Sequence, residues 1–135
     1  MTNCTIVRNA TLGPNSESAN GGGIYQERGE LFVRNTILYD QVAATGSGNV
    51  YSDQIKSGED LSLTVTHSLI DQESIVGVGN LADDPMLDTD FHLRVESPCI
   101  DKGDPNTSPE FDYDGDPRPQ GALPDIGADE FMRAP

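Results

Sequence analysis

Short runs of apolar residues recur along the chain at a constant spacing. The densest run is Leu31–Asp40, in which β-branched, aromatic and aliphatic residues favour a β-strand. Inside this run a short unit begins at Asn35, and copies of that unit begin at Asn3 and His67. Each copy starts with Asn or His followed by a small polar residue or Cys. The spacing from Asn3 to Asn35 is 35 − 3 = 32, and the spacing from Asn35 to His67 is 67 − 35 = 32. A repeat of this length predicts stacked turns of a coiled sheet, with Asn3, Asn35 and His67 at one corner.

The segments between these runs predict further strands, corners and loops. Residues 61–66 alternate between apolar and polar side chains, which predicts a half-buried strand. Residues 21–25 and 46–51 are both rich in glycine and both end in an aliphatic residue and Tyr, so we expect them to form equivalent tight corners. Residues 54–60 are mostly polar or charged and are predicted to form a loop.

The same pattern predicts the fold class. Apolar residues do not recur at helical spacing for more than about two turns, so we expect an all-β protein. Alternation predicts an additional strand at residues 91–95, and residues 125–131 are expected to form a closing strand. Parallel strands wound repeatedly in one direction predict a right-handed parallel β-helix, a single solenoid. We assign residues 1–82 to its rungs and residues 83–135 to a C-terminal cap of the same domain, placed over the end of the stack.

The start of the chain predicts an open edge. A rung begins at Asn3 with no leader and no N-terminal cap before it, which predicts a C-terminal fragment of a longer solenoid. Because an uncovered strand edge pairs readily with another chain, we expect either a homodimer through this exposed β-helix edge or a segment that covers it. Stacked strands lie about 4.8 Å apart, so the three predicted turns between Cys4 and Cys99 separate these residues by roughly 14 Å. That distance exceeds the reach of a disulfide, so both are predicted to be free, buried residues.

Charge narrows the set of partners. Lys and Arg number 8 against 23 Asp and Glu, for a formal net charge of −15. Phosphates would be repelled, which excludes nucleic acid and an anionic membrane surface. No apolar run is long enough for a transmembrane helix, so direct membrane insertion is excluded as well. An acidic polysaccharide would need a bridging divalent cation.

Five segments near the C-terminus form an ordered set of motifs. They are Asp83–Leu87, Phe91–Leu93, Ser97–Asp104, Asp112–Pro119 and Asp125–Glu130. This set resembles the end of bacterial secreted right-handed parallel β-helix proteins of the pectate-lyase-like superfamily, particularly those of the choice-of-anchor Q domain type. The chain departs from that pattern in having Cys99 in place of a small residue and Asp129 where an aromatic residue is common. The resemblance implies a secreted or cell-surface location and polysaccharide as a partner.

The strongest candidate for a metal site is the run Asp112-x-Asp114-Gly115-Asp116. Carboxylates at alternate positions around a glycine turn can surround Ca²⁺. Asp101 and Asp104 are further candidates from the preceding turn. The alternative is an Asp-rich turn in which the Asp side chains accept bonds from backbone N–H groups and Arg118 pairs with one carboxylate of the run.

Catalytic candidates are few. Asp40 and Asp71 occupy nearly corresponding positions in successive copies, so their carboxylates are expected about 5 Å apart, as a glycosidase pair requires. A uronan lyase needs a base beside calcium-binding carboxylates, and no Asp-x-Asp pattern accompanies the available cations. His67 and His92 have no nucleophile motif nearby. Tyr25, Tyr39 and Tyr51 adjoin strand positions and are predicted to pack against the coil. The alternative is an exposed stripe of rings on which a sugar could stack.

These observations favour a noncatalytic function. The leading hypothesis is a structural and capping segment of a secreted or cell-surface β-helix protein, with calcium and carbohydrate as the candidate ligands. The first alternative is a fragment of a polysaccharide lyase or glycoside hydrolase. The second is an adhesin-like binding surface.

Overall fold

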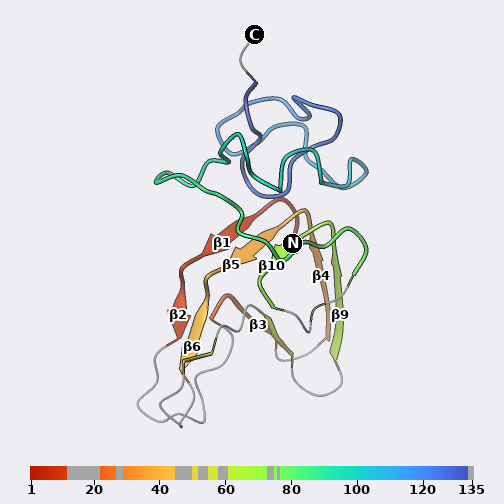
Figure 1. Cartoon of the computed structure of the whole chain (residues 1–135). Helices are drawn as coiled ribbons and strands as arrows, with labels where there is room; N and C mark the ends of the chain where they lie inside the picture. The colour runs from red at the N-terminus through yellow and green to blue at the C-terminus, as the bar shows by residue number, and fades with distance from the viewer. Residues whose placement is uncertain are drawn as a thin grey trace.

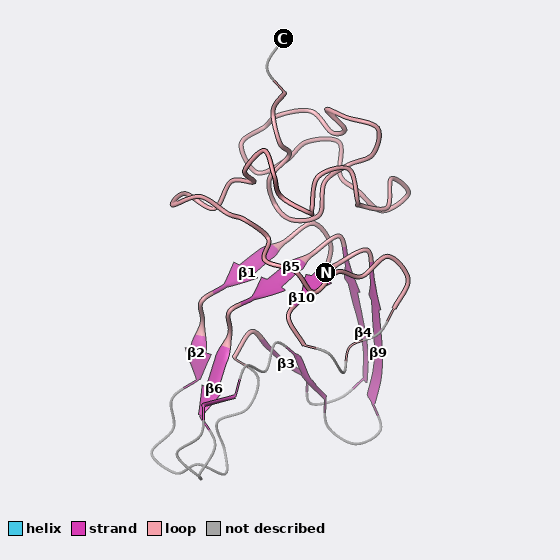
Figure 2. Ribbon diagram, in the orientation of Figure 1, coloured by secondary structure: helices cyan, strands magenta, loops and turns pink. Residues whose placement is uncertain are grey.

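A computed structural model describes residues 1–11, 22–26, 29–44, 50–51, 55–57, 61–72, 75 and 77–133. These residues form strands but no helix, so the chain is all-β as predicted, and none of them provides an apolar helix of membrane-spanning length (Figure 2). The strands are β1 (Thr5–Val7), β2 (Ala10–Thr11), β3 (Ile24–Gln26), β4 (Gly29–Arg34), β5 (Ile37–Tyr39), β6 (Val42–Ala44), β7 (Val50–Tyr51), β8 (Ile55–Ser57), β9 (Leu61–Thr66) and β10 (Leu69–Ile70).

Strands from successive copies of the repeat pair in parallel. In the sheet β1-β5-β10, Ile37 of β5 is opposite Thr5 on one side and Leu69 on the other, so the offsets 37 − 5 and 69 − 37 both equal 32. The β2–β6 and β4–β9 pairs have the same offset, since Ala10 is opposite Val42 and Gly29 is opposite Leu61. The predicted period is therefore confirmed for these three sheets. Figure 1 shows the sheets placed around a common interior.

The predicted corner is also present. Asn3, Asn35 and His67 have φ angles of 47°, 47° and 46°, in the left-handed region that Asn tolerates better than most residues. The Asn35 side-chain amide donates to the Asn3 side-chain oxygen over 3.2 Å, which links two copies of the corner. Conformation and side-chain chemistry thus repeat together at this position.

A second ladder of side chains follows directly after the corner. Thr36 Oγ1 accepts a hydrogen bond from the Cys4 N–H at 3.4 Å, and Ser68 Oγ accepts one from the Thr36 N–H at 3.2 Å. Asn80 Oδ1 continues the series by accepting from the Ser68 N–H at 3.2 Å. Side-chain oxygens of the following copy therefore accept these backbone N–H groups, which fixes the distance between stacked copies of the repeat.

The glycine-rich corners were paired wrongly by the sequence interpretation. Strand β3 pairs with β8, and Ile24 is opposite Ile55, at an offset of 55 − 24 = 31. Residues 50–51 instead form β7, which runs antiparallel to β6. The loop predicted at residues 54–60 consequently contains a strand at Ile55–Ser57. Glycine-rich segments indicate where the backbone can turn sharply, but they do not indicate which strands pair. Strand pairing follows the spacing of the repeat.

Two apolar clusters lie on opposite faces of the sheet β1-β5-β10. The inner cluster contains Leu38, and the outer cluster contains Ile37, and both side chains are 0% exposed because β5 is covered on both faces. The buried members of the inner cluster are Val33, Leu38, Val65 and Ile70, with Ile6, Ile24, Leu31, Leu63 and Ile75 packed against them. Those of the outer cluster are Ile37, Leu69, Leu93, Cys99 and Ile126.

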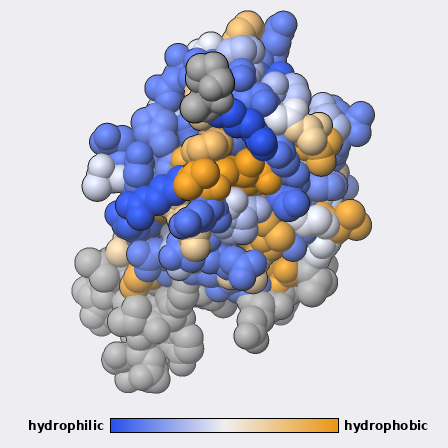
Figure 3. All heavy atoms as spheres, turned by 45° about the horizontal axis from the view of Figure 1, so that its top comes forward, coloured by the Kyte–Doolittle hydropathy of each residue, from blue (hydrophilic) through white to orange (hydrophobic). Residues whose placement is uncertain are grey.

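Residues 83–133, called here the C-terminal segment, supply the other half of the outer cluster. Figure 1 shows this segment in blue-green to blue above β1, β5 and β10. Its buried apolar contacts lie on the outer face of the sheet, whereas the sequence predicted a cap over the end of the stack. Cys99 is a free, buried thiol, as predicted, and Cys4 is free and partly buried. Hydrophilic groups dominate the solvent face of this region, with apolar groups between them (Figure 3).

The two strands predicted in the C-terminal segment do not form. Within residues 91–95 only Leu93 makes a bridge, an isolated antiparallel one to Leu87. The Leu93 N–H donates instead to Asp129 Oδ2 at 2.7 Å, and the Phe131 N–H donates to Asp125 Oδ2 at 2.7 Å. Because carboxylates satisfy these backbone donors, alternation of apolar residues is not accompanied by a strand ladder.

Candidate functional site

Asp40 and Asp71 are neighbours, as their positions in the repeat suggested. The Asp40 backbone N–H donates to Asp71 Oδ2 over 3.1 Å. Arg8 Nε lies 3.9 Å from Asp40 Oδ2 at the solvent-exposed side of the pair. Partial burial raises the pKa of the Asp71 carboxyl, which favours its protonated form. One carboxylate therefore faces a cation while the other is partly withdrawn from water.

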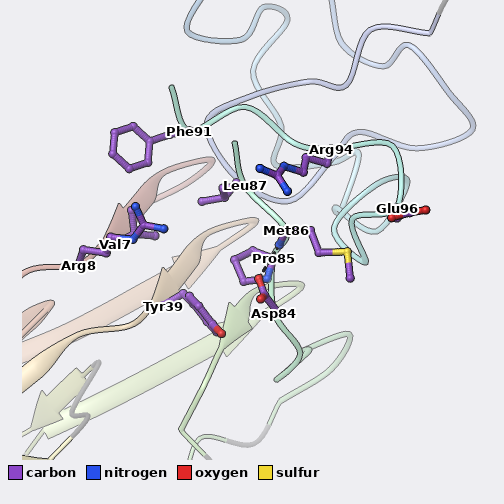
Figure 4. Close-up of a pocket in the computed structure, with 10 residues that line it drawn as sticks. All are labelled: Val7, Arg8, Tyr39, Asp84, Pro85, Met86, Leu87, Phe91, Arg94 and Glu96. Carbon is purple, nitrogen blue, oxygen red and sulfur yellow. Dashed lines mark hydrogen bonds between the residues drawn. The ribbon is translucent and has the colours of Figure 1, made fainter. Parts of the chain in front are cut away.

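A cavity of about 340 Å³ lies beside this pair, between the sheet and the C-terminal segment (Figure 4). Val7 and Tyr39 are the last residues of β1 and β5, and they form the wall on the sheet side. The polar and aromatic groups of the lining are Arg8, Tyr39, Asp84, Phe91, Arg94 and Glu96. The cavity thus brings cations, carboxylates and aromatic rings together from segments far apart in the sequence.

Three residues that line the same cavity have left-handed backbone conformations. Arg8, Met86 and Phe91 line it with φ angles of 57°, 52° and 69°, although none of them is glycine. Left-handed backbone costs a bulky residue roughly 1–2 kcal/mol. Met86 and Phe91 also remain 40% and 44% exposed, so burial returns little of that cost.

The tyrosines divide between packing and exposure. Tyr39 packs against the outer cluster as predicted, and its burial, together with the nearby carboxylates of Asp84, Asp71 and Asp40, raises the pKa of its hydroxyl. Tyr25 is 60% exposed, so the prediction that it packs against the coil is wrong. The side chain of Tyr51 lies outside the described residues.

Both carboxylate oxygens of Asp112 accept hydrogen bonds from backbone N–H groups. Its Oδ1 accepts from the N–H groups of Asp114 and Asp116 at 2.9 and 2.8 Å, and its Oδ2 accepts from the Glu130 N–H at 3.0 Å. Asp114 points away from this turn, toward His92, with 2.9 Å between Asp114 Oδ2 and His92 Nε2. The hydrogen bonds agree with the Asp-rich turn, and the calcium hypothesis for Asp112, Asp114 and Asp116 stays a prediction.

The two additional candidates have similar structural contacts. Asp101 pairs with Arg133 through Oδ2 and accepts the Leu123 N–H at 3.2 Å through Oδ1. Asp104 Oδ1 accepts the Asn106 N–H at 3.0 Å, a bond that lowers the pKa of this exposed carboxyl. The Asp104 N–H donates to Asn35 Oδ1 at 2.7 Å, which ties the C-terminal segment to the repeat corner.

Arg118 has a different partner from the one predicted. Its guanidinium pairs with Glu130 at 3.1 Å, and both side chains are 1% exposed. The same group donates to the carbonyls of Asp125, Gly127 and Ala128 at 3.2, 3.0 and 2.7 Å. The planar fork of the guanidinium matches several acceptors at once, and a loop folded around it offers more of them than the Asp-rich turn does.

A cluster around His92 was missed by the sequence interpretation. Ligand-type atoms of His92, Asp114 and Asp129 all lie within 4.8 Å of one another. The hydrogen bond to Asp114 raises the pKa of the His92 ring. Asp114 and Asp129 both lie far from His92 along the chain. No spacing rule predicts this convergence, because an irregular loop brings the residues together.

No family model, curated protein or solved structure matches the chain. The described residues offer a mixed polar and aromatic cavity, a neighbouring carboxylate pair at Asp40 and Asp71, and the His92 cluster. The cavity can hold a polar ligand with apolar faces, and the carboxylate pair has the elements of an acid and a base.

Proposed function

We propose that the chain forms the last turns of a right-handed parallel β-helix in a secreted or cell-surface protein of the pectate-lyase-like superfamily, choice-of-anchor Q domain type. Parallel pairing repeated at a nearly constant offset supports this proposal. The matching left-handed corners at Asn3, Asn35 and His67 support it further. The location and the family rest on the resemblance of the C-terminal motifs.

Its function in this proposal is structural and noncatalytic. The observation that carries the proposal is the two-sided burial of β5, where Ile37 and Leu38 are both 0% exposed. Ile126 of the C-terminal segment is 0% exposed in the same outer cluster as Ile37. A segment that covers the outer face of a sheet prevents that face from binding other chains. The acidic side chains of the segment hold its loops by accepting backbone N–H groups.

The cavity beside Tyr39 is the proposed binding site for a carbohydrate. Tyr39 and Phe91 offer aromatic faces to the apolar side of a sugar ring, and Arg94 and Glu96 offer a donor and an acceptor for hydroxyl groups. Arg94 makes no salt bridge with any described residue, so its donors remain available. A neutral glycan is favoured over an acidic one because the net charge is −15.

A panel of neutral glycans and uronans tests this function in two readouts, binding and turnover. We expect binding to a neutral glycan without release of products. Arg94→Gln and Phe91→Asn should weaken binding, and Asn suits the left-handed backbone at position 91. The exposed Lys102→Gln variant, outside the cavity, is the matched control. No binding across the panel, or equal binding by all variants, would remove the cavity from the proposal.

The second candidate is catalytic, a fragment of a polysaccharide lyase or glycoside hydrolase. The contact between Asp40 and Asp71 favours it, since one carboxyl has a raised pKa and the other faces Arg8. Turnover of any glycan that disappears in Asp71→Asn, with Asp83→Asn as control, would establish this candidate. It would also contradict a noncatalytic function.

A further inference from the structure

Three side chains from separate segments place metal-binding atoms beside a cavity of about 330 Å³. His92 Nε2 lies 2.9 Å from Asp114 Oδ2, and Asp129 contributes a third atom within 4.8 Å of both. All three residues line the cavity, together with Asp116 and Glu130. Ligands of a tetrahedral zinc ion lie about 3.3 Å from one another, given metal–ligand distances of about 2.0–2.1 Å. The distance between His92 Nε2 and Asp114 Oδ2 is close to that value, and the third atom lies within 4.8 Å of the others.

Asp129 shows that more than a surface ion pair is present. This residue is only 5% exposed, and its Oδ2 accepts the Leu93 N–H at 2.7 Å. Among the described residues, the buried side-chain atoms that lack a hydrogen-bond partner do not include its other oxygen, so that oxygen stays accessible. Asp129 lines the cavity, and its backbone donor holds the carboxylate in place. A carboxylate fixed in this way can offer its second oxygen to an ion, since metal-binding carboxylates are usually held by hydrogen bonds of their own.

The opposite nitrogen of the His92 ring has the neighbour expected in a metal site. His92 Nδ1 lies 3.7 Å from Asp88 Oδ1. That same oxygen accepts the backbone N–H groups of Asp90 and His92 at 2.8 and 3.0 Å, so Asp88 is held in place. A metal-binding His usually donates its second N–H to a carboxylate, which fixes the ring orientation.

The ligand set indicates which ion would bind. Calcium prefers six to eight oxygen ligands, whereas an imidazole with carboxylates suits zinc and related transition metals. Three protein ligands at the edge of a cavity would leave a coordination position for water or a ligand. We propose that His92, Asp114 and Asp129 bind a divalent zinc-class cation, with Asp88 orienting the His92 ring. Tyr113 OH, 2.7 Å from His92 Nε2, lies at the same position and would yield to the ion.

Zinc titration of the whole chain, followed by nitrogen NMR of the imidazole rings and by calorimetry, tests the proposal. The chain has two histidines, so the His67 ring is an internal reference. We expect the His92 ring signals to shift with Zn²⁺ while those of His67 stay in place. His92→Gln and Asp114→Asn should each weaken zinc binding by about tenfold or more. Asp83→Asn removes one exposed negative charge outside the cluster and should leave the affinity within about twofold.

Three outcomes would overturn the proposal. Millimolar Zn²⁺ without a response of the His92 ring would mean that the cluster is only an ion pair between His92 and Asp114. Equal affinity in His92→Gln and in the unaltered protein would place the ion elsewhere. Ca²⁺ that matches the affinity of Zn²⁺ would assign the site to oxygen ligands alone. Circular dichroism of each variant confirms folding, which is expected because His92 and Asp114 side chains are 40% and 43% exposed.

Discussion

Replacement of Arg118 by Met should be among the most destabilising single changes in the C-terminal segment. The guanidinium is buried against Glu130, and the two side chains are each 1% exposed. Removal of one member of a buried ion pair typically costs about 3–5 kcal/mol, because the other charge stays buried without its partner. Arg118→Met would also leave the carbonyls of Asp125, Gly127 and Ala128 without their donor.

These costs overlap, since they all follow from the loss of one group, so we expect a total of about 3–5 kcal/mol. The total is large against the roughly 5–15 kcal/mol that stabilise a typical domain. Urea unfolding followed by circular dichroism measures it. The control is Arg133→Gln, because Arg133 pairs with Asp101 while its side chain is 50% exposed. An exposed pair contributes about 1 kcal/mol or less.

A second variant separates the buried charge from the lost packing. Arg118→Met combined with Glu130→Met removes both charges, so part of the lost stability should return relative to Arg118→Met alone. Recovery will be incomplete, because Glu130 also accepts the N–H groups of Gln120 and Asp125 at 2.7 and 2.9 Å. Arg133→Gln should change the free energy of unfolding by about 1 kcal/mol or less. If Arg118→Met changes it by no more than that, the pair of Arg118 and Glu130 does not hold the C-terminal segment together.

Three further predictions concern the corner, the buried carboxyl and the open edge. Asn35→Gly should lower the free energy of unfolding in urea by about 2–4 kcal/mol, because backbone groups of Asp104 lose their partner. Asn35→Ala should cost about 1 kcal/mol more, because Ala resists a φ of 47°. Equal losses in the two variants would show that the left-handed backbone at position 35 adds no cost. Burial raises the pKa of Asp125 to about 6. Between about pH 4 and about pH 6 the folded state therefore binds more protons, so the free energy of unfolding should fall as pH rises, and less steeply in Asp125→Asn; an opposite slope in thermal melts would refute this. The β1 edge should mediate a concentration-dependent homodimer in sedimentation, reduced by Val7→Pro; a monomer at every concentration would contradict it.

The repeat was predictable because its signal is local and strict. A left-handed corner tolerates few residue types, so Asn3, Asn35 and the position of His67 marked it in the sequence. Residues 61–66 form β9 as their alternation predicted. The β3–β8 pair was missed because residues 46–51 imitate residues 21–25 in composition, although their spacing does not fit the repeat.

The C-terminal segment was predictable as a set of motifs but not as a conformation. Phe91 has a φ of 69°, and Leu93 gives its N–H to Asp129, so alternation there did not lead to a strand. The sequence predicted a nearby carboxylate of the Asp-rich turn as the partner of Arg118, but the loop folds so that Glu130 pairs with it. The contact between His92 and Asp129 could not be predicted for the same reason, since the two residues are far apart in the sequence. In each case an irregular loop, whose path no periodic pattern encodes, brings the partners together.

In the proposed function, the C-terminal segment stays on the sheet β1-β5-β10 as a permanent cover, and amide hydrogen exchange measures whether it does. The Ile37 N–H donates to the Cys4 carbonyl at 2.8 Å, and the Ile126 N–H donates to the Cys99 carbonyl at 3.0 Å. If sheet and cover unfold as one unit, these two amides should exchange with similar, slow rates that report global unfolding. Fast exchange at Ile126 beside a protected Ile37 would show that the cover opens by itself, and would contradict the claim.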